Sequence, residues 1–315
     1  MELKNIIILT QVKGIGPVFF KKNRSKLICS NDCTSFIKEV NEDALSKFSI
    51  YEKFAESVLA DCDSLGVKPI SCLSPNYPKQ LLEINDPPPV IYIKGNEMLL
   101  NKVIAIIGTR HSTPLGNKIA ERLGEHFSQK YAICNGLVEG IDKHSVYYNG
   151  KITSKAIGII SGGLNYTKTC SKVHAQIIDD VLNAGGLIIS EYPPQQPEDK
   201  YSGSKASRIQ AALSQGLILV QSGIDGGSKY TLATFSKLPR VLGVVHFPSS
   251  EEYQSKEFEA NRAIISEQKK GIARFIGLKT TKKIELSSII PIHGKVDYDI
   301  FSSKIENISL QSSFF

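Results

Sequence analysis

The sequence contains no tryptophan and only 2 methionines among its 315 residues. Its 6 cysteines form no C-x-x-C pair, and no histidine or second cysteine pair completes a zinc site around Cys29 and Cys33. We therefore predict neither a bound metal nor a disulfide framework. Free thiols in a chain of this length also predict a reducing, cytoplasmic environment.

Long apolar stretches are missing as well. The apolar run Ile6–Leu9 near the N-terminus is too short for the hydrophobic core of a signal peptide. No segment approaches the roughly 20 apolar residues that a helix needs to cross a bilayer. The sequence thus predicts a soluble protein that does not interact with a membrane.

No strong catalytic signature occurs in the chain. It lacks H-E-x-x-H, G-x-S-x-G, the Walker loop G-x-x-x-x-G-K-[ST] and the dinucleotide fingerprint G-x-G-x-x-G, so we expect no cofactor. Asp142 and His144 are close enough along the sequence to suggest a catalytic dyad. Acidic groups beside a phosphate site more often position their neighbours, so we predict no catalytic residues and no enzymatic activity.

What the chain does have is a modest excess of positive charge. Its 38 Lys and Arg residues outnumber its 31 Asp and Glu residues, which gives a formal net charge of +7 at pH 7. Such a balance favours polyanionic partners, nucleic acids among them. The hydrophobic fraction of 41% is ordinary for a globular protein, and the length predicts one large domain with one or two small modules.

From Val103 onward, short apolar runs alternate with amphipathic segments such as 116–130 and 171–184. Continuously apolar strands are buried on both faces, as in a parallel sheet covered by helices. The alternation therefore predicts a doubly wound, mostly parallel α/β sheet. The predicted strands are Val103–Ile107, Ala132–Cys134, Ala156–Ile160, Leu187–Ile189, Leu217–Val220 and Val241–Val245.

Two flanking regions differ from this central domain, which we place at residues 67–278. Residues 1–66 are predicted to form a small helical domain around the turn Gly14–Pro17, whose glycines permit a tight bend and whose proline suits the start of a helix. This helix-hairpin-helix-like turn either contacts phosphates or serves packing alone. Residues 279–315 show no clear periodicity, so we expect a poorly defined C-terminal extension.

Glycines, hydroxyls and cations follow the carboxyl ends of the predicted strands, where ligands bind in sheets of this class. Glycines leave backbone N–H groups free for an anion, and hydroxyls and cations add donors. Several such segments on one rim predict a phosphate site, the alternative being that the glycines serve tight turns only. The candidate residues are Gly108, Thr109, Arg110, Ser112, Asn135, Gly136, Lys205, Arg208, Gly227, Ser228 and Lys229.

Taken in order, several segments resemble the motifs of the DNA-processing protein A (DprA/Smf) family over roughly residues 70–275. The segments are Tyr77–Pro88, Tyr92–Asn96, Ile104–Arg110, Asn135–Asp142, Ser190–Pro194, Arg208–Ser214, Gly227–Thr231 and Ala260–Ile265. The resemblance implies an extended Rossmann fold that binds single-stranded DNA, forms a homodimer and helps to load a RecA-type recombinase during DNA uptake or repair. It assigns to the DNA phosphate site the residues Gly108, Thr109, Arg110, Asn135, Gly136, Arg208, Gly227 and Ser228.

The chain also departs from the family pattern. Ala206 and Ser207 replace an arginine and an asparagine, and Gly203 stands near the position of an aromatic residue on which a base could stack. No winged helix is visible in the C-terminal segment. Two alternatives to DNA binding stay open: a nucleotide-binding sensor, and a phosphoribohydrolase-like enzyme whose P-G-G-x-G-T-x-x-E loop is matched only in part by Asp225–Ser228.

Overall fold

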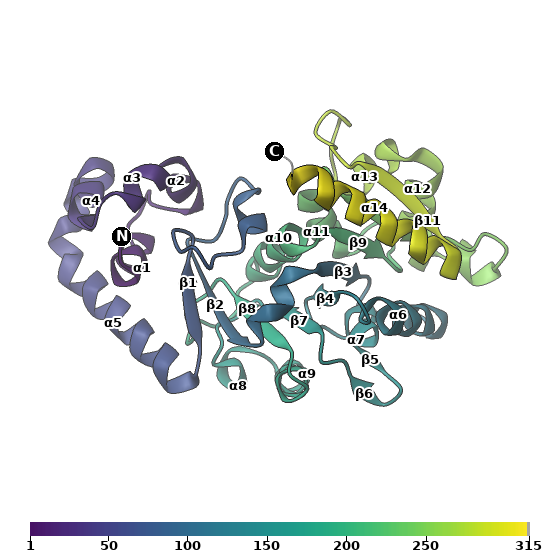
Figure 1. Cartoon of the computed structure of the whole chain (residues 1–315), viewed down its shortest axis with the longest axis horizontal. Coiled ribbons are helices and arrows are strands. Elements are labelled where there is room, and N and C mark those ends of the chain that lie inside the picture. The colour runs from purple at the N-terminus through teal and green to yellow at the C-terminus, as the bar shows by residue number, and fades with distance from the viewer. Residues whose placement is uncertain (314–315) are drawn as a thin grey trace.

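The computed structural model describes residues 1–313 and centres on a 9-stranded sheet with the order β1-β2-β8-β7-β4-β3-β9-β10-β11 (Figure 1). β2 runs antiparallel to β1 and β8, and every other neighbouring pair in this sheet is parallel. The strands are β1 Lys68–Ser71, β2 Val90–Gly95, β3 Val103–Ile107, β4 Ala132–Asn135, β5 Tyr147–Tyr148, β6 Lys151–Ile152, β7 Ala156–Ile159, β8 Leu187–Ser190, β9 Gly216–Leu219, β10 Val241–Val245 and β11 Ser288–Ile292. β5 and β6 form a separate hairpin. The predicted doubly wound, mostly parallel sheet is confirmed.

Helices form the N-terminal part of the chain and cover both faces of the sheet. They are α1 Leu3–Thr10, α2 Pro17–Lys22, α3 Arg24–Ile28, α4 Cys33–Asn41, α5 Phe48–Leu65, α6 Pro114–Phe127, α7 Ile141–Val146, α8 Tyr166–Thr169, α9 Lys172–Asn183, α10 Ser202–Leu213, α11 Ser228–Phe235, α12 Glu259–Glu267, α13 Lys269–Phe275 and α14 Lys295–Ser313. Short 3-10 helices lie at Glu42–Lys47, Lys79–Leu82, Glu97–Asn101, Glu251–Gln254 and Lys256–Phe258. Within residues 1–313, no helix combines the length and apolar character that crossing a bilayer requires.

The parallel strands are apolar throughout because both of their faces are covered. On β9, Leu217 and Leu219 belong to a core with helices α11 to α13, whereas Ile218 belongs to the core on the opposite face. Phe127 of α6 and Phe301 of α14 meet on that second face, with ring centroids 5.6 Å apart. Each fully buried side chain of this size contributes about 1.5–3 kcal/mol, so the sheet forms the stable frame of the molecule.

Helices α1 to α5 form the predicted N-terminal group at one end of the molecule (Figure 1). In the turn before α2, Gly14 has a φ of +100°, and Pro17 is the first residue of the helix. A Cβ on Gly14 would also lie 2.9 Å from a methyl group of Val40, so the positive φ and the close packing account for this glycine without a bound phosphate. Lys21 donates to the carbonyl oxygen of Ile84 over 2.6 Å and ties the group to the segment before β2.

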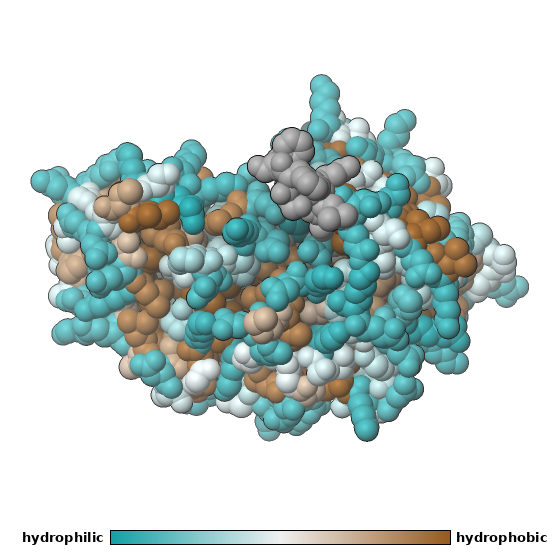
Figure 2. All heavy atoms as spheres, viewed as in Figure 1, coloured by the Kyte–Doolittle hydropathy of each residue, from teal (hydrophilic) through white to brown (hydrophobic). Residues whose placement is uncertain are grey.

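Hydrophilic residues cover most of the face drawn in Figure 2, with scattered apolar patches between them. Several exposed apolar side chains belong to the N-terminal helices, among them Val18 at 49%, Ile28 at 46% and Ile50 at 63% exposure. Single exposed apolar residues are normal on soluble proteins and need no special explanation.

The C-terminal segment was predicted to be poorly defined, and this prediction was wrong for residues 288–313. Strand β11 pairs in parallel with β10, and α14 packs on the sheet through Phe301 and Ile305. A Cβ on Gly216 would lie 2.4 Å from Ile305 and 2.8 Å from Phe301, so that glycine makes room for the helix. Pro291 obscured the strand in the sequence, since proline is tolerated only at a sheet edge, which is where β11 lies. The last two residues of the tail, 314–315, lie outside the described residues.

The strand order places a topological switch between β3 and β9. After β3 the chain adds β4, β7 and β8 on one side, then returns to add β9, β10 and β11 on the other. In such sheets a crevice opens at the switch, outside the carboxyl ends of the strands. The fold therefore brings the segments that follow β3, β4 and β9 to one edge.

Candidate functional site

A groove of about 830 Å³ lies at this edge. Its lining comes from residues within 107–111 after β3, 136–142 after β4, 159–161 after β7, 200–210 in and before α10, and 226–231 at the start of α11. The groove therefore occupies the topological switch, the place where the fold predicts a ligand.

The structure brings some of the candidate residues together in this groove and leaves the others outside its lining. Those in the lining are Gly108, Thr109, Arg110, Gly136, Gly227 and Ser228. Those outside it are Ser112, Asn135, Lys205, Arg208 and Lys229.

The loop after β3 presents an unpaired arginine. Thr109 N donates to the carbonyl oxygen of Gln221 over 2.8 Å, and Thr109 O accepts from Ile141 N over 3.2 Å. A Cβ on Gly108 would lie 2.5 Å from Ile141, so only glycine fits between these neighbours. Arg110 is exposed, and its guanidinium makes no hydrogen bond or ion pair within residues 1–313. The loop is held rigidly while its cation stays free to bind an anion.

Asp142 lies buried at the base of the groove and supports the turn after β4. Its Oδ2 accepts from Gly136 N over 2.9 Å. Burial raises the pKa of the Asp142 carboxyl to about 7, although the Gly136 hydrogen bond and the positive charge of Arg110 act in the opposite direction. The suggested dyad with His144 does not form, because His144 Nδ1 lies 2.8 Å from the Glu121 carboxylate instead. Asp142 is a positioning residue here.

The start of α11 offers donors without acceptors. Ser228 is 6% exposed, and its hydroxyl has no hydrogen-bond partner within the described chain. Neither the Gly227 nor the Ser228 backbone N–H donates to an acceptor in residues 1–313. Because the N-terminus of a helix carries partial positive charge, these donors suit a phosphate or another anion.

The side chains of Asn135 and Ser112 form hydrogen bonds with other residues of the chain. Asn135 is fully buried, and its Nδ2 donates to Asp142 O over 3.1 Å and to Ser145 Oγ over 2.9 Å. The Ser112 hydroxyl donates to the side chain of Asn117 in the first turn of α6. Both residues therefore hold the rim loops in place, and neither faces the groove.

Arg208 departs furthest from its predicted role. Its Nη1 and Nη2 each donate to the Glu191 carboxylate over 2.7 Å, and its Nε lies 2.9 Å from Asp86 Oδ2. The side chains of Arg208 and Glu191 are 9% and 11% exposed. This bidentate pair satisfies the guanidinium and ties α10 to the segment before β2. Arg208 is thus a buried structural cation in this chain.

Lys205 and Lys229 lie beside the groove with their ammonium groups over aromatic rings. Lys205 Nζ is 5.6 Å from the ring centroid of Tyr192, and Lys229 Nζ is 5.8 Å from that of Tyr230. Cation–π contacts of this kind at exposed sites are weak, about 0.5–1 kcal/mol. Neither lysine is held as firmly as Arg208.

Sequence reasoning missed several residues that line the groove. Lys200, Tyr201 and Tyr230 belong to its walls, and the two tyrosines are 59% and 51% exposed. Gln210 also contributes, and its Oε1 accepts from Thr231 over 3.4 Å. The dipeptide Lys-Tyr occurs beside a helix start at both 200–201 and 229–230, but it also occurs at 130–131, where Tyr131 is buried. The dipeptide alone therefore does not identify the groove.

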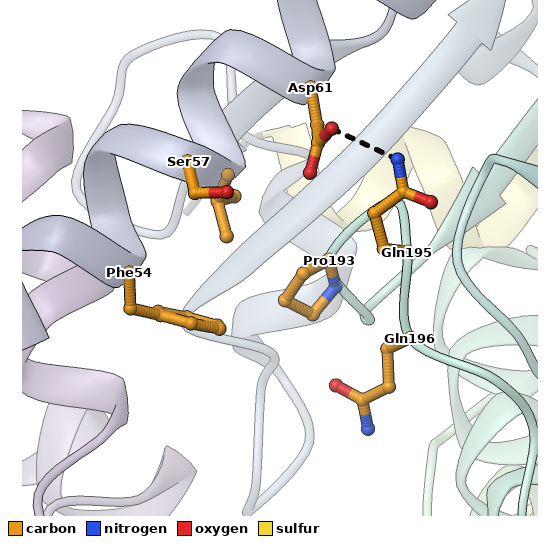
Figure 3. A pocket seen from close by; sticks show the side chains of 7 residues that line it. Phe54, Ser57, Asp61, Pro193, Gln195 and Gln196 are labelled. Carbon is orange, nitrogen blue, oxygen red and sulfur yellow. Dashed lines mark hydrogen bonds between the residues drawn. The ribbon is translucent and has the colours of Figure 1, made fainter.

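A second cavity of about 300 Å³ lies between α5 and the loop after β8 (Figure 3). Phe54 and Pro193 line it, and Gln195 Nε2 donates to Asp61 Oδ1 over 2.9 Å to join its two sides. None of the candidate phosphate-binding residues belongs to this cavity. Nor do residues 1–313 gather three His, Cys, Asp or Glu side chains that could hold a metal ion.

Comparison with known families and proteins gives consistent matches. Residues 68–276 match the family described as DNA recombination-mediator protein A, close to the predicted central domain at 67–278, whose bounds stay a prediction. The chain is 33% identical over 177 residues to DNA processing protein DprA of Bacillus subtilis, which covers 55% of this chain and 59% of that protein. It is 29% identical over 161 residues to Protein Smf of Escherichia coli, covering 49% of this chain and 41% of that protein. The chain spans about half the length of these curated relatives.

Solved structures show the same fold. The X-ray structure of DNA processing protein A from Streptococcus pneumoniae matches with a TM-score of 0.65 and 22% identity, over 85% of this chain and 94% of that one. DNA processing protein A from Helicobacter pylori, described with a unique single-stranded DNA binding mode, matches with a TM-score of 0.56 and 24% identity. That match covers 67% of this chain and 94% of the other. Both matches agree with the extended Rossmann fold that the sequence resemblance implied.

Proposed function

Because the chain belongs to the DNA recombination-mediator protein A family, we propose that it binds single-stranded DNA in the groove at the carboxyl ends of the central strands and acts in DNA processing during uptake or recombination. The observation that carries this proposal is that the unpaired Arg110 guanidinium and the free donors of Gly227 and Ser228 line the same groove. Donors of this kind bind phosphate groups, and a nucleic acid strand supplies them at regular intervals.

The charge of the groove supports the same ligand. Arg110 and Lys200 are exposed cations in its lining, and the whole chain carries a formal charge of +7. Among the described residues that line the groove, Asp142 carries the buried carboxyl group, and burial raises its pKa to about 7. A group with this pKa is partly protonated near neutral pH, so it repels a phosphate less than an ordinary aspartate does.

We infer that the protein binds DNA without transforming it. Asp142 is engaged with Gly136, and His144 with Glu121, so neither is arranged to move a proton to or from a substrate. A homodimer, delivery of the bound strand to a RecA-type recombinase and a cytoplasmic location complete the proposal. The homodimer and the delivery to a recombinase rest on the family resemblance, whereas the cytoplasmic location rests on the free cysteines.

Fluorescence anisotropy with a labelled oligonucleotide tests the proposal directly. We expect the single strand to bind more tightly than its duplex, and the logarithm of its affinity to fall linearly against the logarithm of salt concentration as counterions are released. Equal affinity for both forms, or no binding at low salt, would contradict it. A thermal-shift screen with mononucleotides tests the sensor alternative, since a specific small ligand raises the apparent unfolding temperature.

A further inference from the structure

Two tyrosines in the groove stand out by their exposure. Tyr201 is 59% exposed and Tyr230 is 51% exposed, and both line the groove. No other phenylalanine or tyrosine side chain described by the structure belongs to the exposed class. Among the residues whose side chains the structure describes, the aromatic rings are therefore buried or half-buried except at the proposed DNA site.

The backbone around these rings is fixed, although the rings bury little surface. The Asp199 carboxylate accepts from Tyr201 N over 2.7 Å and from Ser202 N over 2.8 Å, at the start of α10. Tyr230 lies in the first turn of α11, where its N–H donates to Gly227 O over 3.1 Å. Neither tyrosine hydroxyl makes a hydrogen bond within residues 1–313. The rings are thus held at the groove without being needed for the core.

Each ring has a lysine immediately before it in the sequence. Lys200 Nζ lies 4.8 Å from the ring centroid of Tyr201, and Lys229 Nζ lies 5.8 Å from that of Tyr230. The same Lys-Tyr dipeptide therefore occurs twice around one groove. An aromatic ring next to a cation matches the repeating unit of a nucleic acid strand, in which each base is joined through its sugar to a phosphate.

We propose that Tyr201 and Tyr230 stack against unpaired bases, while Lys200 and Lys229 bind the neighbouring phosphates, and that this stacking makes the groove select single strands. The inference rests on the proposed DNA-binding function and adds to it the residues that discriminate against duplex. Bases in a duplex are already paired and stacked, so their faces are not open to these rings. Because every base has an aromatic face, the preference is independent of sequence.

The test compares an intact single strand with an abasic strand of the same length, which keeps the sugar–phosphate chain and lacks the bases. The variants are Y201A and Y230A, each matched by its phenylalanine counterpart, Y201F or Y230F. We expect each alanine variant to lower the affinity for the intact strand about 5- to 150-fold, with little effect on the abasic strand. The phenylalanine variants retain binding, because the ring and not the hydroxyl makes the contact.

A tryptophan reporter supplies an independent reading, since the chain has no tryptophan of its own. In Y201W the single indole should keep the affinity for DNA, and its emission should be quenched by the intact strand but not by the abasic one. M98W is the matched control, because Met98 is 69% exposed and lies outside the groove lining. Its emission should stay unchanged on adding either strand.

The outcomes separate this inference from the function on which it rests. If the wild-type protein binds intact and abasic strands equally, or if Y201A and Y230A bind the intact strand as the wild type does, stacking is overturned while DNA binding stands. If the wild type binds neither strand, both proposals fail. Unchanged thermal unfolding of the variants shows that any loss of affinity comes from the missing rings.

Discussion

Two arginines near the same edge of the sheet have opposite surroundings. Arg110 follows β3, is exposed, and makes no hydrogen bond or ion pair in the described chain. Arg208 lies within α10, is 9% exposed, and is bound by Glu191 and Asp86. The sequence presents them alike, since both belong to segments that resemble one family. The comparison shows that resemblance to a family motif does not tell which of two cations the fold leaves unpaired.

The carboxylate near each arginine explains the difference. Glu191 gives both of its oxygens to Arg208, so the two charges compensate each other below the surface. Asp142 instead accepts from the backbone of Gly136, and burial raises its pKa to about 7. Arg110 therefore keeps its charge available, whereas the charge of Arg208 stabilises the protein itself.

The largest expected effect comes from breaking the Arg208 pair. R208A leaves the Glu191 carboxylate buried without a partner, so we expect the free energy of unfolding to fall by about 3–5 kcal/mol in urea denaturation. E191Q and the double variant complete a mutant cycle, in which the two changes should be far from additive. If R208A instead has the unfolding free energy of the wild type but loses its affinity for DNA, Arg208 binds phosphate, as the sequence predicted.

The parts of the fold that the sequence predicted depend on local patterns. Apolar runs such as Val103–Ile107 are strands because burial on both faces requires apolar residues at every position. The grouping of Gly108, Gly136 and Gly227 at one edge then followed from the topology, because parallel strands end on the same side. Strand β11 was missed because Pro291 is foreign to a central strand and acceptable only at an edge.

The parts that the sequence did not predict depend on contacts between distant segments. Arg208 is satisfied by Asp86, which lies 122 positions earlier in the chain, and no local pattern indicates such a partner. Asn135 has nearer partners, since its Nδ2 donates to Asp142 O and Ser145 Oγ in the following helix, but it also donates to Ile106 O, 29 positions earlier. The exposure of Tyr201 was also hidden, since a tyrosine in a sequence is equally compatible with a core position.

A smaller effect, confined to binding, is expected at Arg110. R110A should lower the affinity for single-stranded DNA about 10- to 150-fold, as the loss of a charged hydrogen bond of about 1.5–3 kcal/mol implies. The slope of log affinity against log salt should fall by about 0.7, because one phosphate contact is lost. The free energy of unfolding of R110A should stay within about 0.5 kcal/mol of the wild-type value.

K283A is the matched control for R110A, because Lys283 is an exposed cation in the segment before β11, outside the groove lining. It removes the same unit of charge from the whole molecule. An equal loss of affinity in K283A and R110A would mean that net charge, and not a contact at the groove, holds the strand.

The smallest expected effect is a pH dependence set by Asp142. Its pKa of about 7 lies above the ordinary 3.8, so the carboxyl loses its proton as the pH rises through 7 and then repels a phosphate in the groove. We expect the affinity for single-stranded DNA to fall by about fivefold between pH 6 and 8, near the 1 kcal/mol of two charges a few ångströms apart in water. Anisotropy titrations across this range measure the fall.

D142N isolates this contribution, since its amide oxygen can still accept from Gly136 N while carrying no charge. His111 also lines the groove, and D142N keeps it, so the difference between the two pH profiles belongs to Asp142. The same raised pKa makes the wild-type fold less stable as the pH rises from about 4 to 7, because the unfolded state loses the proton of Asp142 near pH 4 while the folded state keeps it up to about pH 7. D142N should therefore gain stability relative to the wild type over that range. Parallel pH profiles of affinity for the wild type and D142N would contradict this expectation. They would show that Asp142 is already ionised at pH 6 and that its negative charge offsets the positive charge of Arg110.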